Sequence, residues 1–124
     1  MNIEKAHESL NAADLCFQNL MYNSTANRAY YAMFQAAIVA LKQTGITPQG
    51  EQWSHEGVQA MFALELTRQR KIFDNQMVKD LLDVLALRNI ADYRDRTITQ
   101  RNAQQALQKS HHFVDVVVHW IEHG

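Results

Sequence analysis

The chain has 124 residues, a net charge of −1, 47% hydrophobic residues and 20% charged residues. This length suits one domain with its own buried core, and the near-neutral charge argues against broad electrostatic capture of nucleic acid. The lone cysteine, Cys16, excludes an internal disulfide, while the lack of a signal-like start and of a long apolar run predicts a cytoplasmic protein with no membrane partner.

Two helices are predicted in the first third of the chain. Apolar residues recur at spacings of three and four from Ile3 to Leu20, which indicates a first helix with one apolar stripe. The polar residues 23–25 are expected to cap a second helix, which runs to about Gln43 and stops at Gly45. The second helix is apolar on two sides, so we expect it to be central in a bundle or shared with another subunit.

Three further helices are predicted after a loop at residues 45–53, which holds the single proline. Ser54 is expected to cap a short third helix, a fourth helix covers about Asp74 to Tyr93, and Thr99 caps a fifth. Strand patterns are nearly absent. Residues 1–124 are therefore predicted to form one all-α domain, an up-and-down antiparallel four-helix bundle with an additional short helix at one end.

The segment ALRNIADYRDR, residues 86–96, is the main candidate for a functional site. Arg88 and Asp92 are four residues apart and lie on one face of the fourth helix, where they could form an ordinary ion pair. Arg88 also follows Leu81 and Val84 on their apolar stripe. An arginine there would lie at the edge of the core or in a groove between helices, where it can hold a carboxylate or a phosphate.

Other candidate residues lie on other helices. The position of His55 near a helix N-terminus would lower its pKa and leave a neutral imidazole that accepts a proton, unless it only hydrogen-bonds its own cap. Arg28 and Tyr31 are three residues apart on the second helix, where they could hold a base or nucleotide, or Tyr31 could be a core or interface residue. Arg94 follows Arg88 in the one locally basic segment of the chain.

The remaining histidines are predicted to be solvated side chains and not metal ligands. His111 and His112 are adjacent and point in different directions from a helix, and no cysteine or carboxylate array accompanies them. The chain also lacks a glycine-rich phosphate loop, a nucleophile elbow and paired catalytic carboxylates. We therefore expect neither a metal nor a cofactor.

Three segments, in this order, resemble the HEPN domain (higher eukaryotes and prokaryotes nucleotide-binding). They are NRAYYAMFQAAIVAL (27–41), SHEGVQAMF (54–62) and LRNIADY (87–93), and the resemblance is to the small stand-alone branch called UPF0332. It covers nearly the whole chain and implies a four-helix core with an extra short helix, usually in a homodimer. Many HEPN proteins are metal-independent ribonucleases, often the toxin beside a small nucleotidyltransferase antitoxin.

The sequence departs from the ribonuclease motif of that family at one position. The motif is an arginine followed, after four to six residues, by a histidine, and Arg88 matches the arginine. Tyr93, Arg94 and Asp95 stand where the histidine belongs. The ADY ending is usual in this branch, so any chemistry must use another group, such as His55 if the fold brings it near Arg88. Tyr93 also resembles, more loosely, a tyrosine that partner nucleotidyltransferases adenylylate in a related branch.

The sequence leaves two functions open. The first is binding of RNA or a nucleotide in a groove, beside a minimal nucleotidyltransferase in a toxin–antitoxin or stress-defence module. Arg88 would hold phosphate, Asp92 would orient it and Tyr93 would hydrogen-bond or stack. Since the motif histidine is missing, metal-independent ribonuclease activity is left as an open question. The alternative is a non-catalytic helical adaptor that acts through its dimer or a protein partner. The groove of the first function is expected to be lined by Arg28, Tyr31, His55, Arg88, Asp92 and Tyr93.

Overall fold

A computed structural model describes residues 3–48, 50, 52–92 and 96–124, together with the backbone of Tyr93. These residues form no β-strand, and none of their helices combines the length and apolar character needed to cross a membrane. The predicted all-α class is confirmed. The helices are α1 (Glu4–Gln18), α2 (Tyr22–Gln43), α3 (His55–Met61), its π-helical continuation η1 (Phe62–Gln69), α4 (Asn75–Tyr93) and α5 (Gln100–His123).

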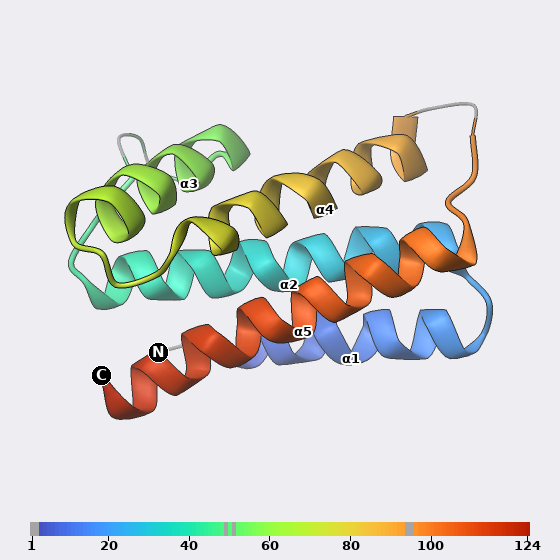
Figure 1. The fold of residues 1–124 in the computed structure, drawn as a ribbon, viewed down its shortest axis with the longest axis horizontal. Coiled ribbons are helices and arrows are strands. Elements are labelled where there is room, and N and C mark those ends of the chain that lie inside the picture. The colour runs from blue at the N-terminus through green and yellow to red at the C-terminus, as the bar shows by residue number, and fades with distance from the viewer. Residues whose placement is uncertain (1–2, 49, 51, 94–95) are drawn as a thin grey trace.

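The four long helices α1, α2, α4 and α5 form the predicted up-and-down bundle (Figure 1). α1 and α4 run in one direction along the bundle, and α2 and α5 run in the other. α2 contacts the other three and also α3, and it contributes a buried run of alanines and larger apolar residues. Small side chains let neighbouring helices approach closely. The central position therefore accounts for the two apolar sides of α2 within a single chain.

The short helix is anchored in the same core as the bundle. α3 and η1 lie on the outside of α2 and α4, at the end where α2 stops and α4 starts (Figure 1). The fully buried ring of Phe62 in η1 stacks on Phe73 at 5.2 Å between ring centres and lies 5.3 Å from the ring of Phe113 in α5. Aromatic pairs at these separations add to the apolar area that they bury. The packing fixes the place where α3 starts against α2.

Three predicted helix ends are confirmed. The Ser54 Oγ accepts a hydrogen bond from the Gly57 N–H at 2.9 Å, and the Thr99 Oγ1 accepts one from the Asn102 N–H at 3.1 Å. A Cβ at position 57 would lie 2.8 Å from the Ser54 Oγ, so glycine leaves room for this cap. Gly45 stops α2 with a φ of +80°, a conformation that glycine adopts without strain.

The predicted cap of α2 at residues 23–25 is wrong. α2 begins at Tyr22, so these polar residues lie inside its first turn. Their side chains serve elsewhere: the Thr25 hydroxyl donates to the Met21 carbonyl at 2.8 Å, and the Asn23 Oδ1 accepts from the Ile98 N–H at 2.8 Å. The residue at the cap position of α2 is Met21, whose side chain makes no capping hydrogen bond.

Leu20 adopts a φ of +63°, and we expect Leu20→Gly to raise the free energy of unfolding by about 0.5–1 kcal/mol. The leucine side chain is 70% exposed, so its loss removes little buried area while the backbone strain is relieved. Leu15, an exposed residue inside α1, provides the control: Leu15→Gly should lower the free energy of unfolding by roughly 1 kcal/mol. Urea unfolding measures both, and a destabilised Leu20→Gly would show that this side chain makes contacts of its own.

Candidate functional site

Predicted site residues from three helices meet at one place on α2. Arg88 of α4 places its guanidinium carbon 5.5 Å from the ring centre of Tyr30 and 5.6 Å from that of Tyr31. His55, the first residue of α3, has its ring centre 5.6 Å from Tyr30 and 6.2 Å from Tyr31. His55 and Arg88 are thus brought to the same pair of tyrosines, which is the proximity that any joint chemistry requires.

Arg88 is a largely buried cation, with 13% of its side chain exposed. Its Nε lies 3.3 Å from the Asp92 Oδ2, so the ion pair expected from their spacing is present. The Asn27 Nδ2 donates to the same carboxylate oxygen at 2.9 Å. Burial of a guanidinium is costly unless carboxylates and aromatic faces compensate its charge. Because arginine carries five N–H donors in a fixed fork, it can pair with a carboxylate and a phosphate together.

Arg28 adds a second positive charge beside Tyr31. Its Nε and Nη2 donate to the Asn27 Oδ1 at 3.1 and 2.7 Å, and its guanidinium carbon lies 4.8 Å from the Tyr31 ring centre. Asn27 therefore links Arg28 to Asp92, and the Tyr31 ring contacts both arginines. The two guanidinium groups flank one partly exposed aromatic ring, an arrangement that can hold an anionic ligand with a flat group.

His55 is neutral at pH 7 in this environment. Its ring packs on Phe34, with 4.5 Å between ring centres. Burial and, after it, the positive charge of Arg88 lower the pKa of His55 below its ordinary 6.5, whereas Glu56 acts in the opposite direction. The direction agrees with the prediction from the helix N-terminus, but burial and Arg88 are the causes.

The Tyr30 hydroxyl selects the tautomer of His55. It is fully buried, lies 3.0 Å from the His55 Nδ1 and accepts a hydrogen bond from the Gln59 Nε2 at 3.3 Å. Burial raises the pKa of Tyr30, so the hydroxyl keeps its proton. Among the described residues, the His55 Nδ1 is the acceptor in reach of that proton, which places the imidazole proton on Nε2. In that tautomer neutral His55 offers an N–H donor at Nε2, and in the other tautomer it offers the proton acceptor that the sequence predicts.

NMR titration should give a pKa below 6.5 for the His55 ring, and Arg88→Met should raise it because a positive charge is removed while burial remains. The unfolded chain binds this proton more tightly than the folded protein. The free energy of unfolding therefore falls as the pH drops from 6.5 through the folded pKa. Arg101→Met, at an exposed arginine of α5, is the control. An unchanged His55 pKa in Arg88→Met would show that the two side chains do not interact.

Two predicted site residues cannot be placed. The side chain of Tyr93 and the whole of Arg94 lie outside the described residues. Their assignment to the site stays a prediction from the sequence.

Sequence analysis missed four participants, although two of them left a signal. A tyrosine on the buried face of a helix must find a partner for its hydroxyl, which points to Tyr30. Gln59 follows His55 by one helical turn, and residues four apart share a helix face. Asn27 and Phe34 carry no comparable signal because their roles depend on how α2 packs against α3 and α4.

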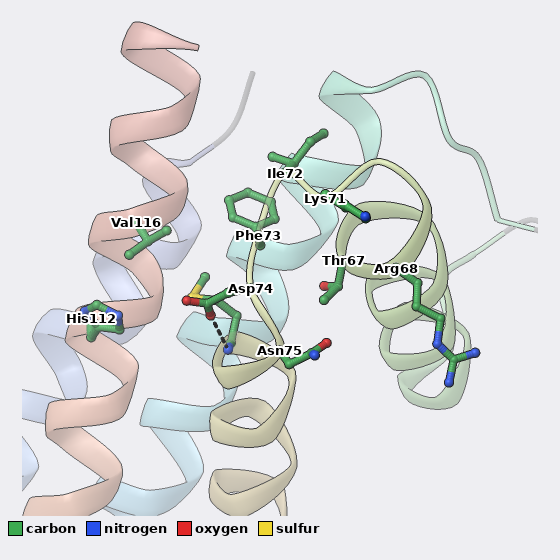
Figure 2. A pocket seen from close by; sticks show the side chains of 10 residues that line it. Thr67, Arg68, Lys71, Ile72, Phe73, Asp74, Asn75, His112 and Val116 are labelled. Carbon is green, nitrogen blue, oxygen red and sulfur yellow. Dashed lines mark hydrogen bonds between the residues drawn. The ribbon is translucent and has the colours of Figure 1, made fainter.

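A cavity of about 710 Å³ lies apart from these residues, between η1, the start of α4, and α5 (Figure 2). Its lining includes Arg68, Lys71 and His112. Asp74, also in the lining, accepts a hydrogen bond from the Met77 N–H at 3.3 Å and so closes the first turn of α4. The cavity contains none of the predicted site residues.

Among the described residues, no group of three or more His, Cys, Asp and Glu side chains is placed to hold a metal ion. The His111 Nε2 lies 2.8 Å from the Asp14 Oδ1, which ties α5 to α1. His119 and His123 are exposed, with 4.6 Å between their ring centres, and no other described residue joins this pair as a metal ligand.

Comparison with known proteins gives a family match and three relatives. The family model of the HEPN domain matches residues 2–120. The chain is 32% identical over 116 residues to "Putative toxin MJ0605" of Methanocaldococcus jannaschii, covering 91% of this chain and 81% of that protein. "Putative toxin MJ0142" of the same organism is 31% identical over 115 residues, with 91% and 74% covered. "UPF0332 protein glr0978" of Gloeobacter violaceus is 24% identical over 121 residues, with 96% and 92% covered.

Proposed function

This chain belongs to the HEPN domain family, and we propose that it binds RNA or a nucleotide at the cluster of Tyr30, Tyr31, His55, Arg88 and Asp92, called here the Arg88 site. The observation that carries the proposal is the contact of His55 and Arg88, from different helices, with the same two tyrosines. A guanidinium and an imidazole N–H beside aromatic rings suit a phosphodiester with its ribose or base. The names of two relatives support a role in a toxin–antitoxin or stress-defence module.

Four residues of the Arg88 site have a part in binding. Arg88 pairs with a phosphate oxygen, and Asp92 holds the guanidinium in place. His55 donates its Nε2 proton to the same phosphate group. Tyr31, in contact with Arg28 and Arg88, supports the base or ribose.

Metal-independent RNA cleavage is a further part of the proposal. The ribose 2′-oxygen attacks the neighbouring phosphorus and its proton passes to the Asp92 carboxylate, while the bond to the 5′-oxygen breaks and that oxygen takes a proton from water. The hydroxide left by the water then takes the proton from Asp92 and restores the carboxylate. The products are a 2′,3′-cyclic phosphate and a 5′-hydroxyl. Arg88 and the neutral His55 stabilise the charge that develops on the phosphate oxygens. In this mechanism His55 replaces the motif histidine as a hydrogen-bond donor and does not act as a general base.

A homodimer and a minimal nucleotidyltransferase partner complete the proposal. Both are expectations for a member of the HEPN family, and the relatives named as putative toxins support a partner protein. The adaptor alternative has less support because α2, the surface it would have offered, lies at the centre of its own bundle. Light scattering after size exclusion measures the mass of the protein in solution and so tests the dimer.

The proposal is tested with a labelled single-stranded RNA in excess EDTA. Fluorescence anisotropy should show binding that weakens with salt, and a denaturing gel should show cleavage to products with cyclic phosphate ends. Binding without cleavage would remove the ribonuclease part and keep the rest. No binding of RNA or of mononucleotides at low salt would reject the Arg88 site as a nucleotide site.

A further inference from the structure

A groove of about 510 Å³ lies next to the Arg88 site, bordered by α1, α2 and the connector before α3. Tyr31 belongs to both places, and Phe34 connects them. They contact His55 in the Arg88 site, at 6.2 and 4.5 Å between ring centres, and they also line the groove. A ligand that occupies the Arg88 site can therefore continue along α2 into the groove.

The lining of the groove has the composition of a nucleotide site. Phe34, Ile38 and Trp53 provide apolar and aromatic surface, and Lys5 and Lys42 stand in the lining with no carboxylate among its described residues. Aromatic rings hold bases of any sequence by stacking, and lysines bind the phosphates between them. The volume lies in the range of sites that bury a small organic ligand.

Two polar groups of the lining can bond to a base. The indole N–H of Trp53 is buried and has no hydrogen-bond partner among the described residues. A buried donor without an acceptor is destabilising, so an acceptor atom of a ligand would relieve that cost. The Gln35 Oε1 accepts from the Ser9 hydroxyl at 2.9 Å, which fixes the amide and leaves its N–H groups as donors in the lining.

We propose that the groove binds the nucleotide next to the phosphate held at the Arg88 site, so that the ligand is a single-stranded oligonucleotide. The inference rests on the proposed function and specifies its substrate class. The base lies against Phe34 and Trp53, and the adjoining phosphate lies near Lys42. A duplex does not fit this arrangement because its bases are stacked and paired with one another.

Trp53 gives a direct readout of the groove. The chain has two tryptophans, and the other, Trp120, lies near the C-terminal end of α5 outside the groove lining and packs against Phe73, with 5.4 Å between ring centres. Trp120→Phe therefore leaves Trp53 as the single tryptophan. Titration of this variant with a single-stranded hexanucleotide of adenylate should quench the Trp53 emission. The affinity should exceed that for adenosine monophosphate by at least about tenfold, since a stacked base adds that much.

A matched pair of charge reversals tests the groove separately from the Arg88 site. In the Trp120→Phe background, Lys42→Glu should weaken hexanucleotide binding about tenfold, because it replaces a phosphate contact with a repulsion. Lys79→Glu, the same change at an exposed lysine of α4 outside the groove, should have little effect. Arg88→Met is measured in parallel, by quenching of Trp53 and by anisotropy of the labelled oligonucleotide.

The outcomes separate this inference from the proposed function. Quenching that depends on both Lys42 and Arg88 supports the inference. A different result would be binding that depends on Arg88, does not quench Trp53 and is the same in Lys42→Glu. This result overturns the groove as an oligonucleotide site and keeps the Arg88 site; a protein partner would then be the better occupant of the groove. Quenching that is lost in Lys42→Glu and unchanged in Arg88→Met keeps the groove and overturns the Arg88 site. No binding by any probe overturns both.

Discussion

Arg88→Met should weaken RNA binding by about 10- to 100-fold while the protein keeps its fold and its mass in solution. A charge-assisted hydrogen bond to phosphate contributes roughly 1.5–3 kcal/mol, and the loss of the guanidinium removes at least one such bond. Methionine fills much of the space of the arginine stem, so the packing against Tyr30 and Tyr31 is largely kept. Asp92 loses its ion-pair partner, but its side chain is 26% exposed and still accepts the hydrogen bond from the Asn27 Nδ2, so we expect the fold to survive the loss of the pair. Any cleavage should fall by about 100-fold or more.

Three controls assign the effect of Arg88→Met to the site. Arg101→Met removes the same charge from an exposed position in the first turn of α5 and should change binding little. Arg88→Lys keeps the charge without the fork and should bind with intermediate affinity. Thermal melts establish that each variant is folded. Binding equal to the wild type in a folded Arg88→Met would assign this arginine to the bundle alone.

Local patterns in the sequence predict the helices of this protein and miss one of their starts. The caps at Ser54 and Thr99 and the stop at Gly45 follow from side-chain oxygens and from a missing Cβ, which act over three or four residues. The start of α2 does not follow, because Leu20 takes the left-handed conformation that glycine usually supplies. The turn between α1 and α2 contains no glycine, so the sequence gives no signal for it.

The same distinction between local and distant contacts governs the candidate site. The pair of Arg88 and Asp92 is predictable since both residues lie one turn apart on one helix. The meeting of Arg88 with His55 is not, because it depends on where the connector places α3 on α2. The role of Asn27, which contacts Asp92 from the other side of the α2–α4 interface, is hidden for the same reason.

The tautomer of His55 decides the chemistry available to the site. If the Tyr30 hydroxyl donates to Nδ1, the imidazole can donate from Nε2 but cannot take a proton there until it changes tautomer. A neutral imidazole that donates to a developing oxyanion is an established catalytic role. We therefore expect His55 to act on the phosphate oxygens as a donor, with its low pKa keeping it neutral at pH 7.

His55→Ala should lower RNA cleavage by about 100-fold or more, and His55→Gln should retain most of it. Removal of one preformed donor to a developing oxyanion typically costs that factor. The glutamine amide carries an N–H donor at about the distance of the imidazole Nε2, so it can replace a donor but cannot transfer a proton. Below the pKa of His55 the wild type gains a positive charge, and its RNA binding should strengthen with falling pH, whereas that of His55→Gln should not.

The comparison of alanine with glutamine distinguishes a donor from a general base. If both variants lose cleavage equally while RNA binding and melting temperature stay near those of the wild type, His55 transfers a proton and the tautomer inferred from Tyr30 is not the reactive one. Tyr30→Phe then separates the two cases further. It removes the hydroxyl that holds Nδ1 and leaves the ring beside Arg88. If His55 acts as a donor, it should lose its fixed orientation in this variant, and RNA cleavage should be slower. If His55 acts as a general base, the rate of RNA cleavage should stay the same or increase, because the imidazole can then move its proton to Nδ1 and free the lone pair at Nε2.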